Sequence, residues 1–264
     1  GGRFVNVGDL VGGTSGLVIT ADEIEVVTGS SITGNVSLDA ALRVAGSLEL
    51  SSDLTHSLTI VDTGEVTVIA EISGTDQSLS NDGTLVLADD TGLTGLAQYA
   101  GAGRLDLGQN AAFGAADLSI GGTATLAAGA SLTGADRFVI AEDGRLQTAA
   151  GGGTVLISAA SGLNIEAEGV LDVAAGDTLS GTGLDLSNSG DVNIGTGAAL
   201  TLASLQSDGE VTNSGTLTVT DAITLSGGSM VNTGAISGAV AVSGGALTNS
   251  GTVTGGVTLT GGTV

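Results

Sequence analysis

The sequence contains no cysteine, proline, tryptophan or lysine, and aromatic residues make up only 2% of its 264 residues. The absence of cysteine excludes a disulfide-stabilised fold, a thiolate metal site and a cysteine nucleophile. No charged segment followed by an apolar one marks a signal peptide. The longest uncharged stretch, residues 222–264, alternates small polar and aliphatic residues and is not a membrane span.

Positive charge is also scarce. Five arginines stand against 28 acidic residues, which gives a formal net charge of −23. A nucleic-acid-binding protein needs cations to neutralise phosphates, so a nucleic-acid partner is excluded. Anionic lipid surfaces repel the same charge, and we expect no direct membrane insertion.

The chain is instead rich in glycine and small aliphatic residues. It has 47 glycines, and 41% of its residues are hydrophobic. That apolar content is too high for a disordered chain, and collagen would need proline and a glycine at every third position. Glycine, serine, threonine and β-branched residues recur too densely for helices. The composition therefore predicts short strands joined by glycine corners.

An internal repeat sets the phase of these strands. Ten glycines recur at intervals of 17 to 25 residues: Gly64, Gly83, Gly103, Gly122, Gly144, Gly169, Gly190, Gly215, Gly234 and Gly251. The residues two positions after and four positions before these anchors are apolar in all ten cases. Seven of the ten residues four positions after them are also aliphatic. A spacing of two is the strand period, so these columns should face inward.

A unit of about 20 residues cannot bury its apolar face alone and must stack on its neighbours. The sequence therefore predicts an all-β, right-handed parallel β-helix, or β-solenoid, of about 13 rungs of about 20 residues each. Residues 34–38 and 46–50 fit the same pattern, so one solenoid domain should cover residues 1–264 as part of a longer repeat protein. A β-sandwich requires no such repeat, and propeller blades need about 40 residues with aromatic motifs.

Asparagine forms a second column two positions before five of the anchors. Its members are Asn81, Asn188, Asn213, Asn232 and Asn249. Asparagine tolerates the left-handed conformation, so this column predicts corner residues. Their side chains could also pair with those of the next rung.

Two segments share the pattern Asn-Ser-Gly-Thr followed by alternating apolar residues. They are Val-Thr-Asn-Ser-Gly-Thr-Leu-Thr-Val at 211–219 and Leu-Thr-Asn-Ser-Gly-Thr-Val-Thr-Gly at 247–255. Over residues 60–264 the repeat resembles the passenger repeats of bacterial autotransporters and related haemagglutinin-like adhesins. The resemblance implies a secreted stalk at the bacterial cell surface with adhesive or self-associating flanks. The implied partners are further copies or neighbouring repeats, and host or surface glycans.

No catalytic residue is expected. His56 is the single histidine and lies near Asp53 and Asp62, but nothing places a serine on a strained elbow beside it. A polysaccharide-cleaving β-helix would cluster carboxylates on neighbouring rungs beside a cation. With the anchors as phased above, outward acids such as Asp172 and Asp191 do not form such a column. We therefore expect a structural or adhesive protein and not an enzyme, with a polysaccharide-binding or polysaccharide-cleaving β-helix as the alternative.

No cofactor is expected either. Calcium, which prefers oxygen ligands, is the best metal candidate. Asp89, Asp90, Thr91 and Gly92 follow a strand at a bend, and residues 181–185 partly match a glycine-aspartate calcium repeat in single copy. Solvated acids in turns are the better explanation of both segments, so no metal-binding residue is assigned.

Two surface features complete the sequence-based predictions. Thr-x-Thr pairs at 123/125, 216/218 and 252/254 never fall in adjacent units, which speaks against a threonine array that binds ice. No charge follows Asp221, so the C-terminal end lacks the charges that discourage association between strand edges. We therefore predict self-association there, which an aspartate pair at Thr258 and Thr260 would oppose.

Overall fold

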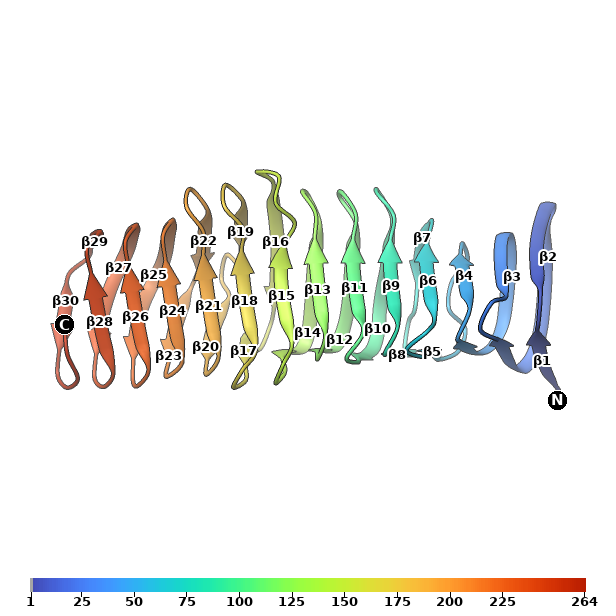
Figure 1. Cartoon of the computed structure of the whole chain (residues 1–264), viewed down its shortest axis with the longest axis horizontal. Helices are drawn as coiled ribbons and strands as arrows, with labels where there is room; N and C mark the ends of the chain where they lie inside the picture. Colours follow the sequence, from blue (N-terminus) through green and yellow to red (C-terminus); the bar gives the residue numbers. More distant parts are fainter. Residues whose placement is uncertain (1) are drawn as a thin grey trace.

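The computed structural model describes residues 2–264, except for the side chains of residues 14–16 and 35, and builds this part of the chain from 30 strands without a helix. The strands form an elongated rod with the two termini at opposite ends (Figure 1). In that view the chain runs up the front face and returns behind while it advances from N- to C-terminus, which is a right-handed coil. The predicted parallel β-solenoid is therefore confirmed.

Each rung contributes a strand to three faces, here called A, B and C in chain order, and strands of neighbouring rungs pair in parallel. The described strands of face A are β4 (Ser47–Leu50), β6 (Glu65–Val68), β9 (Thr84–Leu87), β11 (Arg104–Leu107), β13 (Thr123–Leu126), β15 (Arg145–Thr148), β18 (Val170–Val173), β21 (Asp191–Ile194), β24 (Glu210–Asn213), β26 (Ser229–Asn232) and β28 (Ala246–Asn249).

Face B contains β7 (Glu71–Ser73), β16 (Thr154–Ala159), β19 (Thr178–Ser180), β22 (Ala199–Leu202) and β29 (Thr252–Thr254). Face C contains β5 (Leu58–Ile60), β8 (Ser78–Asn81), β17 (Leu163–Ile165), β20 (Asp185–Asn188), β23 (Ser204–Ser207) and β30 (Val257–Leu259). Five longer strands begin on face B and end on face C: β10 (Gly92–Ala100), β12 (Ala112–Ile120), β14 (Ser131–Ile140), β25 (Thr216–Leu225) and β27 (Ala235–Val242).

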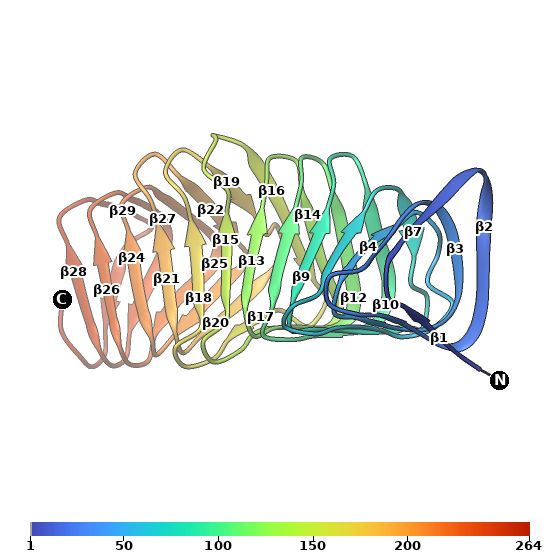
Figure 2. The same cartoon turned by 45° about the vertical axis from the view of Figure 1, so that its right-hand side comes forward.

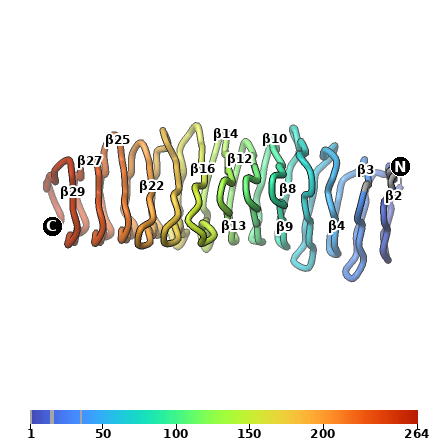
Figure 3. The backbone as a smooth tube through the Cα atoms, turned by 90° about the horizontal axis from the view of Figure 1, so that it is seen from above, coloured from blue at the N-terminus to red at the C-terminus, as the bar shows by residue number. Residues whose placement is uncertain are grey.

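The N-terminal rungs are built from longer strands. β1 (Arg3–Asn6) pairs with the end of β2 (Asp9–Val26), which pairs along its length with β3 (Ser31–Val44). Since β2 and β3 each add a stretch to face A, the described chain has 13 rungs, as predicted. At about 4.8 Å per rung they span about 60 Å. Figures 2 and 3 show the rungs stacked one after another along the long axis.

Inward side chains form one continuous aliphatic core, because alternate residues of every strand face the inside. The predicted inward columns are confirmed: all ten residues four positions before the anchor glycines are buried. The ten residues two positions after the anchors are buried as well, except Val253, which is partly exposed. Tyr99 and Phe113 add an edge-to-face aromatic pair with ring centroids 5.0 Å apart.

The anchor glycines do not form one column, which corrects the sequence-based phasing. Anchors up to Gly190 precede face-A strands, whereas the last three precede face-B strands; the neighbour of Gly190 on the next rung is Gly209. A Cβ atom at Gly209 would lie 2.2 Å from the carbonyl oxygen of Gly190, and one at Gly234 would lie 2.1 Å from that of Gly215. At the corners before face A and before face B alike, the carbonyl oxygen of the preceding rung leaves no room for a side chain. Glycine is therefore required at both corners, and the sequence pattern could not distinguish them.

Candidate functional site

The structure does not assemble the triad drawn around His56. Its Nδ1 atom lies 3.0 Å from the Thr55 hydroxyl and 3.6 Å from a carboxylate oxygen of Asp39, and the ring is half exposed. Asp53, which lies near His56 in the sequence, accepts a hydrogen bond from the Ser73 backbone N–H at 2.6 Å. Within the described residues, the hydroxyl beside His56 is therefore a threonine on an open surface.

Two arginines on face A pair with carboxylates. The Arg104 Nε atom lies 2.5 Å from Asp106 Oδ2, and this hydrogen bond, together with the aspartate charge, raises the pKa of Arg104 above its ordinary value. Arg145 on β15 forms an ion pair with Asp172, which lies on the next rung. In these pairs the charge of each arginine is compensated by a carboxylate of the solenoid itself.

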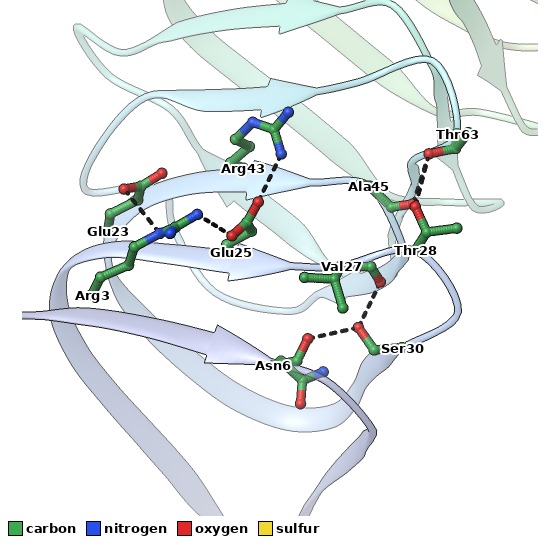
Figure 4. Close-up of polar contacts among 10 residues, drawn as sticks. All are labelled: Arg3, Asn6, Glu23, Glu25, Val27, Thr28, Ser30, Arg43, Ala45 and Thr63. Carbon is green, nitrogen blue, oxygen red and sulfur yellow. Dashed lines mark hydrogen bonds and ion pairs between the residues drawn. The ribbon is translucent and has the colours of Figure 1, made fainter.

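The N-terminal rungs contain a similar stack of opposite charges. Figure 4 shows Glu25 of β2 between Arg3 of β1 and Arg43 of β3, with Glu23 also beside Arg3. The Arg43 Nη1 atom lies 2.9 Å from Glu25 Oε1, and the Arg3 Nε atom lies 3.4 Å from Glu23 Oε2. Each of the five arginines lies within 4.0 Å of a carboxylate.

Two outward acids share one column on neighbouring rungs, although without the neighbouring cation that a polysaccharide-cleaving site would need. Asp191 of β21 lies directly beside Glu210 of β24. The sequence missed this pair because it took Gly215, and not Gly209, as the anchor after Gly190. The ion pairs of the described residues include neither acid, so no cation accompanies the pair.

The candidate calcium ligands are bonded to the next rung. Asp89 accepts a hydrogen bond from the Gln109 backbone N–H at 2.7 Å, and Asp90 accepts one from the Asn110 side chain at 2.8 Å. Asp185 accepts a hydrogen bond from a serine hydroxyl at 2.6 Å. Among residues 2–264, no group of three or more histidine, cysteine or acidic side chains is placed to hold a metal ion.

The asparagine column divides between two faces. On face A, Asn213 donates to Asn232 at 2.7 Å, and Asn232 donates to Asn249 at 2.6 Å, which confirms the predicted pairing between rungs. Asn81 and Asn188 end strands of face C instead. The predicted left-handed conformation is wrong, because none of the five has a positive φ. All five end a strand, where the backbone is extended; four of them are buried, and Asn249 near the C-terminal end is exposed.

Face B carries no charge from β10 onward, and we call this surface the neutral face. Its outward residues are Gly92, Thr94, Ala112, Gly114, Ser131, Thr133, Thr154, Leu156, Ser158, Thr178, Ser180, Ala199, Thr201, Thr216, Thr218, Ala235, Ser237, Thr252 and Thr254. Leu156 lies in the middle of this surface and is 51% exposed. A long flat strip thus lacks charge in a protein of net charge −23.

Hydroxyl groups are continuous along part of the neutral face. Ser180, Thr201, Thr218, Ser237 and Thr254 lie side by side on five adjacent rungs. The Thr-x-Thr pairs themselves never occupy adjacent rungs, as expected. The pairs 216/218 and 252/254 lie on face B with Ala235 and Ser237 of one rung between them, and the pair 123/125 lies on face A.

The acids gather at a different place. The corner between faces C and A, here called the acid corner, carries Asp62, Asp82, Glu142, Asp143, Glu166, Glu168 and Asp208. It is the one corner that does not border face B. The charge-free surface thus begins at Gly92 and follows a face, whereas the sequence placed it at the C-terminal end after Asp221.

One carboxylate lies beneath the neutral face. Asp177 is 1% exposed and accepts hydrogen bonds from the Thr148 hydroxyl at 2.6 Å and from the backbone N–H groups of Gly152 and Gly153 at 2.6 and 3.1 Å. These hydrogen bonds hold the glycine-rich loop of residues 149–153, which connects β15 to β16. The sequence contained a signal for this buried acid, because Asp177 stands at a position that the next rung fills with an apolar residue, Ala198.

No protein-family model and no curated protein matches the sequence. Among solved structures, the crystal structure of a TibC-catalysed hyper-glycosylated TibA fragment, residues 55–350, is similar over 100% of both chains, with 14% identity and a TM-score of 0.47. Residues 2–264 contain no helix that is long and apolar enough to cross a membrane.

Proposed function

We propose that this chain is a structural and adhesive segment of an extracellular bacterial surface or fibre protein. The solenoid serves as a stalk, and the neutral face binds a second copy of the chain. In this proposal the chain needs no cofactor and catalyses no reaction. The observation that carries it is the run of nineteen outward positions without a charge on face B.

Charge placement supports face-to-face pairing of two copies. Contact through the acid corner would bring like charges together, which costs free energy at each rung that carries an acid there. Contact through the neutral face avoids this cost and leaves the two acid corners outermost, because that corner is opposite face B. Leu156, at 51% exposure, supplies an apolar group in the middle of the contact.

The size of the surface sets the expected affinity. Nine strands at about 4.8 Å spacing, with an outward width of about 10 Å, give roughly 400 Å² of flat surface per copy. Stable interfaces bury about 800 Å² per partner, so the contact belongs to the weak, reversible class. Many parallel stalks on one surface would reinforce such a contact through avidity.

Sedimentation velocity over a concentration series tests the proposal. We expect the wild type to form dimers reversibly at high micromolar concentration and more strongly at 1 M salt, where screening reduces repulsion between the acids. A Thr201→Asp/Thr218→Asp variant should stay monomeric. The matched control, Asn193→Asp/Thr212→Asp, adds the same charges to face A of the same rungs and should still dimerise.

Two results would contradict this assignment. A wild type that remains monomeric at millimolar concentration has no self-association surface. Equal loss in both variants would show that total charge, and not face B, controls association. The alternative of a polysaccharide-cleaving β-helix is tested separately by incubation with neutral and acidic glycans: new reducing ends or unsaturated products would show that the chain is an enzyme.

A further inference from the structure

Face C contains a polar hollow of about 320 Å³ across the rungs of β14, β17, β20 and β23. It arises from one glycine. Arg137 and Asp185 occupy the same outward row two rungs apart, and Gly162, with a φ of +84°, lies between them. Because this glycine has no side chain, the row is interrupted and a recess opens between a cation and a carboxylate.

The neighbouring row lines the recess with hydrogen-bonding groups. Asn164, Ser187 and Gln206 lie side by side on successive rungs, about 4.8 Å apart. Within the described part of the chain, none of their side chains forms a hydrogen bond to the protein. Two amides and a hydroxyl, which both donate and accept, therefore face the same open space.

The charges at the recess nearly cancel. Arg137 Nη2 lies 3.9 Å from Glu166 Oε1, so its charge is partly compensated. Asp185 accepts one hydrogen bond, from Ser204 at 2.6 Å, and is otherwise exposed. An anionic ligand would meet Asp185 and the net charge of −23, and a cation would meet Arg137. A neutral ligand with many hydroxyl groups matches both the donors and the acceptors.

We infer that this recess binds a neutral oligosaccharide whose hydroxyl groups bridge Arg137, Asn164, Ser187, Gln206 and Asp185 across four rungs. The site lies on face C and does not depend on the proposed self-association through face B. The chain has no tryptophan, and no exposed aromatic ring borders the recess to stack on a sugar. Binding therefore rests on hydrogen bonds that compete with water, and we expect millimolar dissociation constants.

Two-dimensional ¹H–¹⁵N NMR titration with four tetrasaccharides tests this inference: maltotetraose, cellotetraose, chitotetraose and, as the anionic probe, tetragalacturonate. At least one neutral tetrasaccharide should shift the amide signals of residues 162–164, 185–187 and 204–206 with a millimolar midpoint. Tetragalacturonate should bind at least tenfold more weakly. An Asn164→Ala/Gln206→Ala variant should weaken binding of the neutral probe at least tenfold.

The control variant is Thr224→Ala. Thr224 continues the same row one rung beyond Gln206, outside the recess, so its loss should leave the titration unchanged. All three altered side chains face outward, and thermal unfolding of each variant will verify that the fold is intact. Absence of shifts with every neutral probe, or equal affinity in the double variant and the wild type, would overturn the site. Tighter binding of tetragalacturonate would overturn its assignment to neutral ligands.

Discussion

The neutral face and the acid corner lie on opposite sides of the same rungs, yet their interiors are alike. Strands β22 on face B and β21 on face A both alternate buried aliphatic residues with outward polar ones. Folding therefore imposes no charge pattern on the outside. The separation of 19 uncharged outward positions from a corner with seven acids is a property of the surface alone. Surface properties of this kind govern contacts with other molecules.

The largest expected effect is the difference in stability between a substitution inside the neutral face and one outside it. Leu217 of β25 is fully buried, whereas its neighbour Thr216 is exposed. Leu217→Asp places an unpaired charge in a continuous core and should lower the free energy of unfolding by at least about 4 kcal/mol. Thr216→Asp should cost less than about 0.5 kcal/mol. Urea denaturation measures both, and similar losses would refute the assignment of inside and outside.

The second prediction concerns the acid beneath the neutral face. Asp177→Ala removes the acceptor of three hydrogen bonds and should destabilise the fold by about 2–4 kcal/mol. Hydrogen exchange at the Gly152 and Gly153 amides should accelerate. Asp136→Ala, at the exposed border of the same face, should change stability by less than about 0.5 kcal/mol. If the two variants behave alike, Asp177 does not anchor the loop.

The third prediction tests the core next to the acid corner. Burial raises the pKa of Tyr99 from 10.0 to about 12; the hydrogen bond from Asn81 lowers it and the nearby charge of Asp82 raises it. Above pH 10 the unfolded chain loses the phenol proton, while the native state keeps it until about pH 12. The free energy of unfolding should therefore fall by about 2–3 kcal/mol across this range, and the stabilisation is complete below pH 10.

Tyr99 offers a clean measurement, because the chain has one tyrosine and no lysine. Tyrosinate absorbance gives the pKa of the native state directly. Tyr99→Phe should remove the alkaline loss of stability and cost about 1 kcal/mol at neutral pH through the missing bond to Asn81. An unchanged alkaline decline in this variant would show that ionisation of Tyr99 does not cause it.

The smallest expected effect lies at the acid corner itself. Asp82→Asn and Asp208→Asn alter exposed side chains and should each change the free energy of unfolding by less than about 0.5 kcal/mol. Any gain at low salt should vanish at 1 M salt, where the screening length is about 3 Å. Self-association through the neutral face should persist in both variants. If it disappears, the acid corner takes part in the contact.

Much of the fold followed from residue patterns. The period of two placed Val192 and Leu217 inside, and the repeat required stacked rungs, because one rung cannot bury its own apolar side. The asparagine pairing was also foreseeable, although the conformation of Asn213 and Asn232 was not. Their position at the inward end of a strand depends on where the strand stops, which the repeat alone does not specify.

The surfaces were less predictable for a specific reason. Corner lengths vary: four residues, 181–184, separate β19 from β20, whereas one residue, Ala203, separates β22 from β23. A shortened corner shifts every later residue relative to the repeat, but it leaves the inward alternation intact. The sequence therefore assigned Gly215 to the wrong corner while still placing Leu217 in the core.

The sequence by itself determined that this chain is an all-β stack of rungs with an aliphatic interior, since burial of alternate residues is a local requirement repeated along the chain. The tertiary structure decided which residues of distant rungs share a face. Pairing between whole rungs sets that register, so it alone brought Ser180, Thr201 and Thr218 into one column and placed Asn164, Ser187 and Gln206 around the gap at Gly162. Backbone hydrogen bonds between rungs join residues that lie about 20 positions apart in the sequence. The alternation of inward and outward side chains within a strand does not specify which of these distant residues pair.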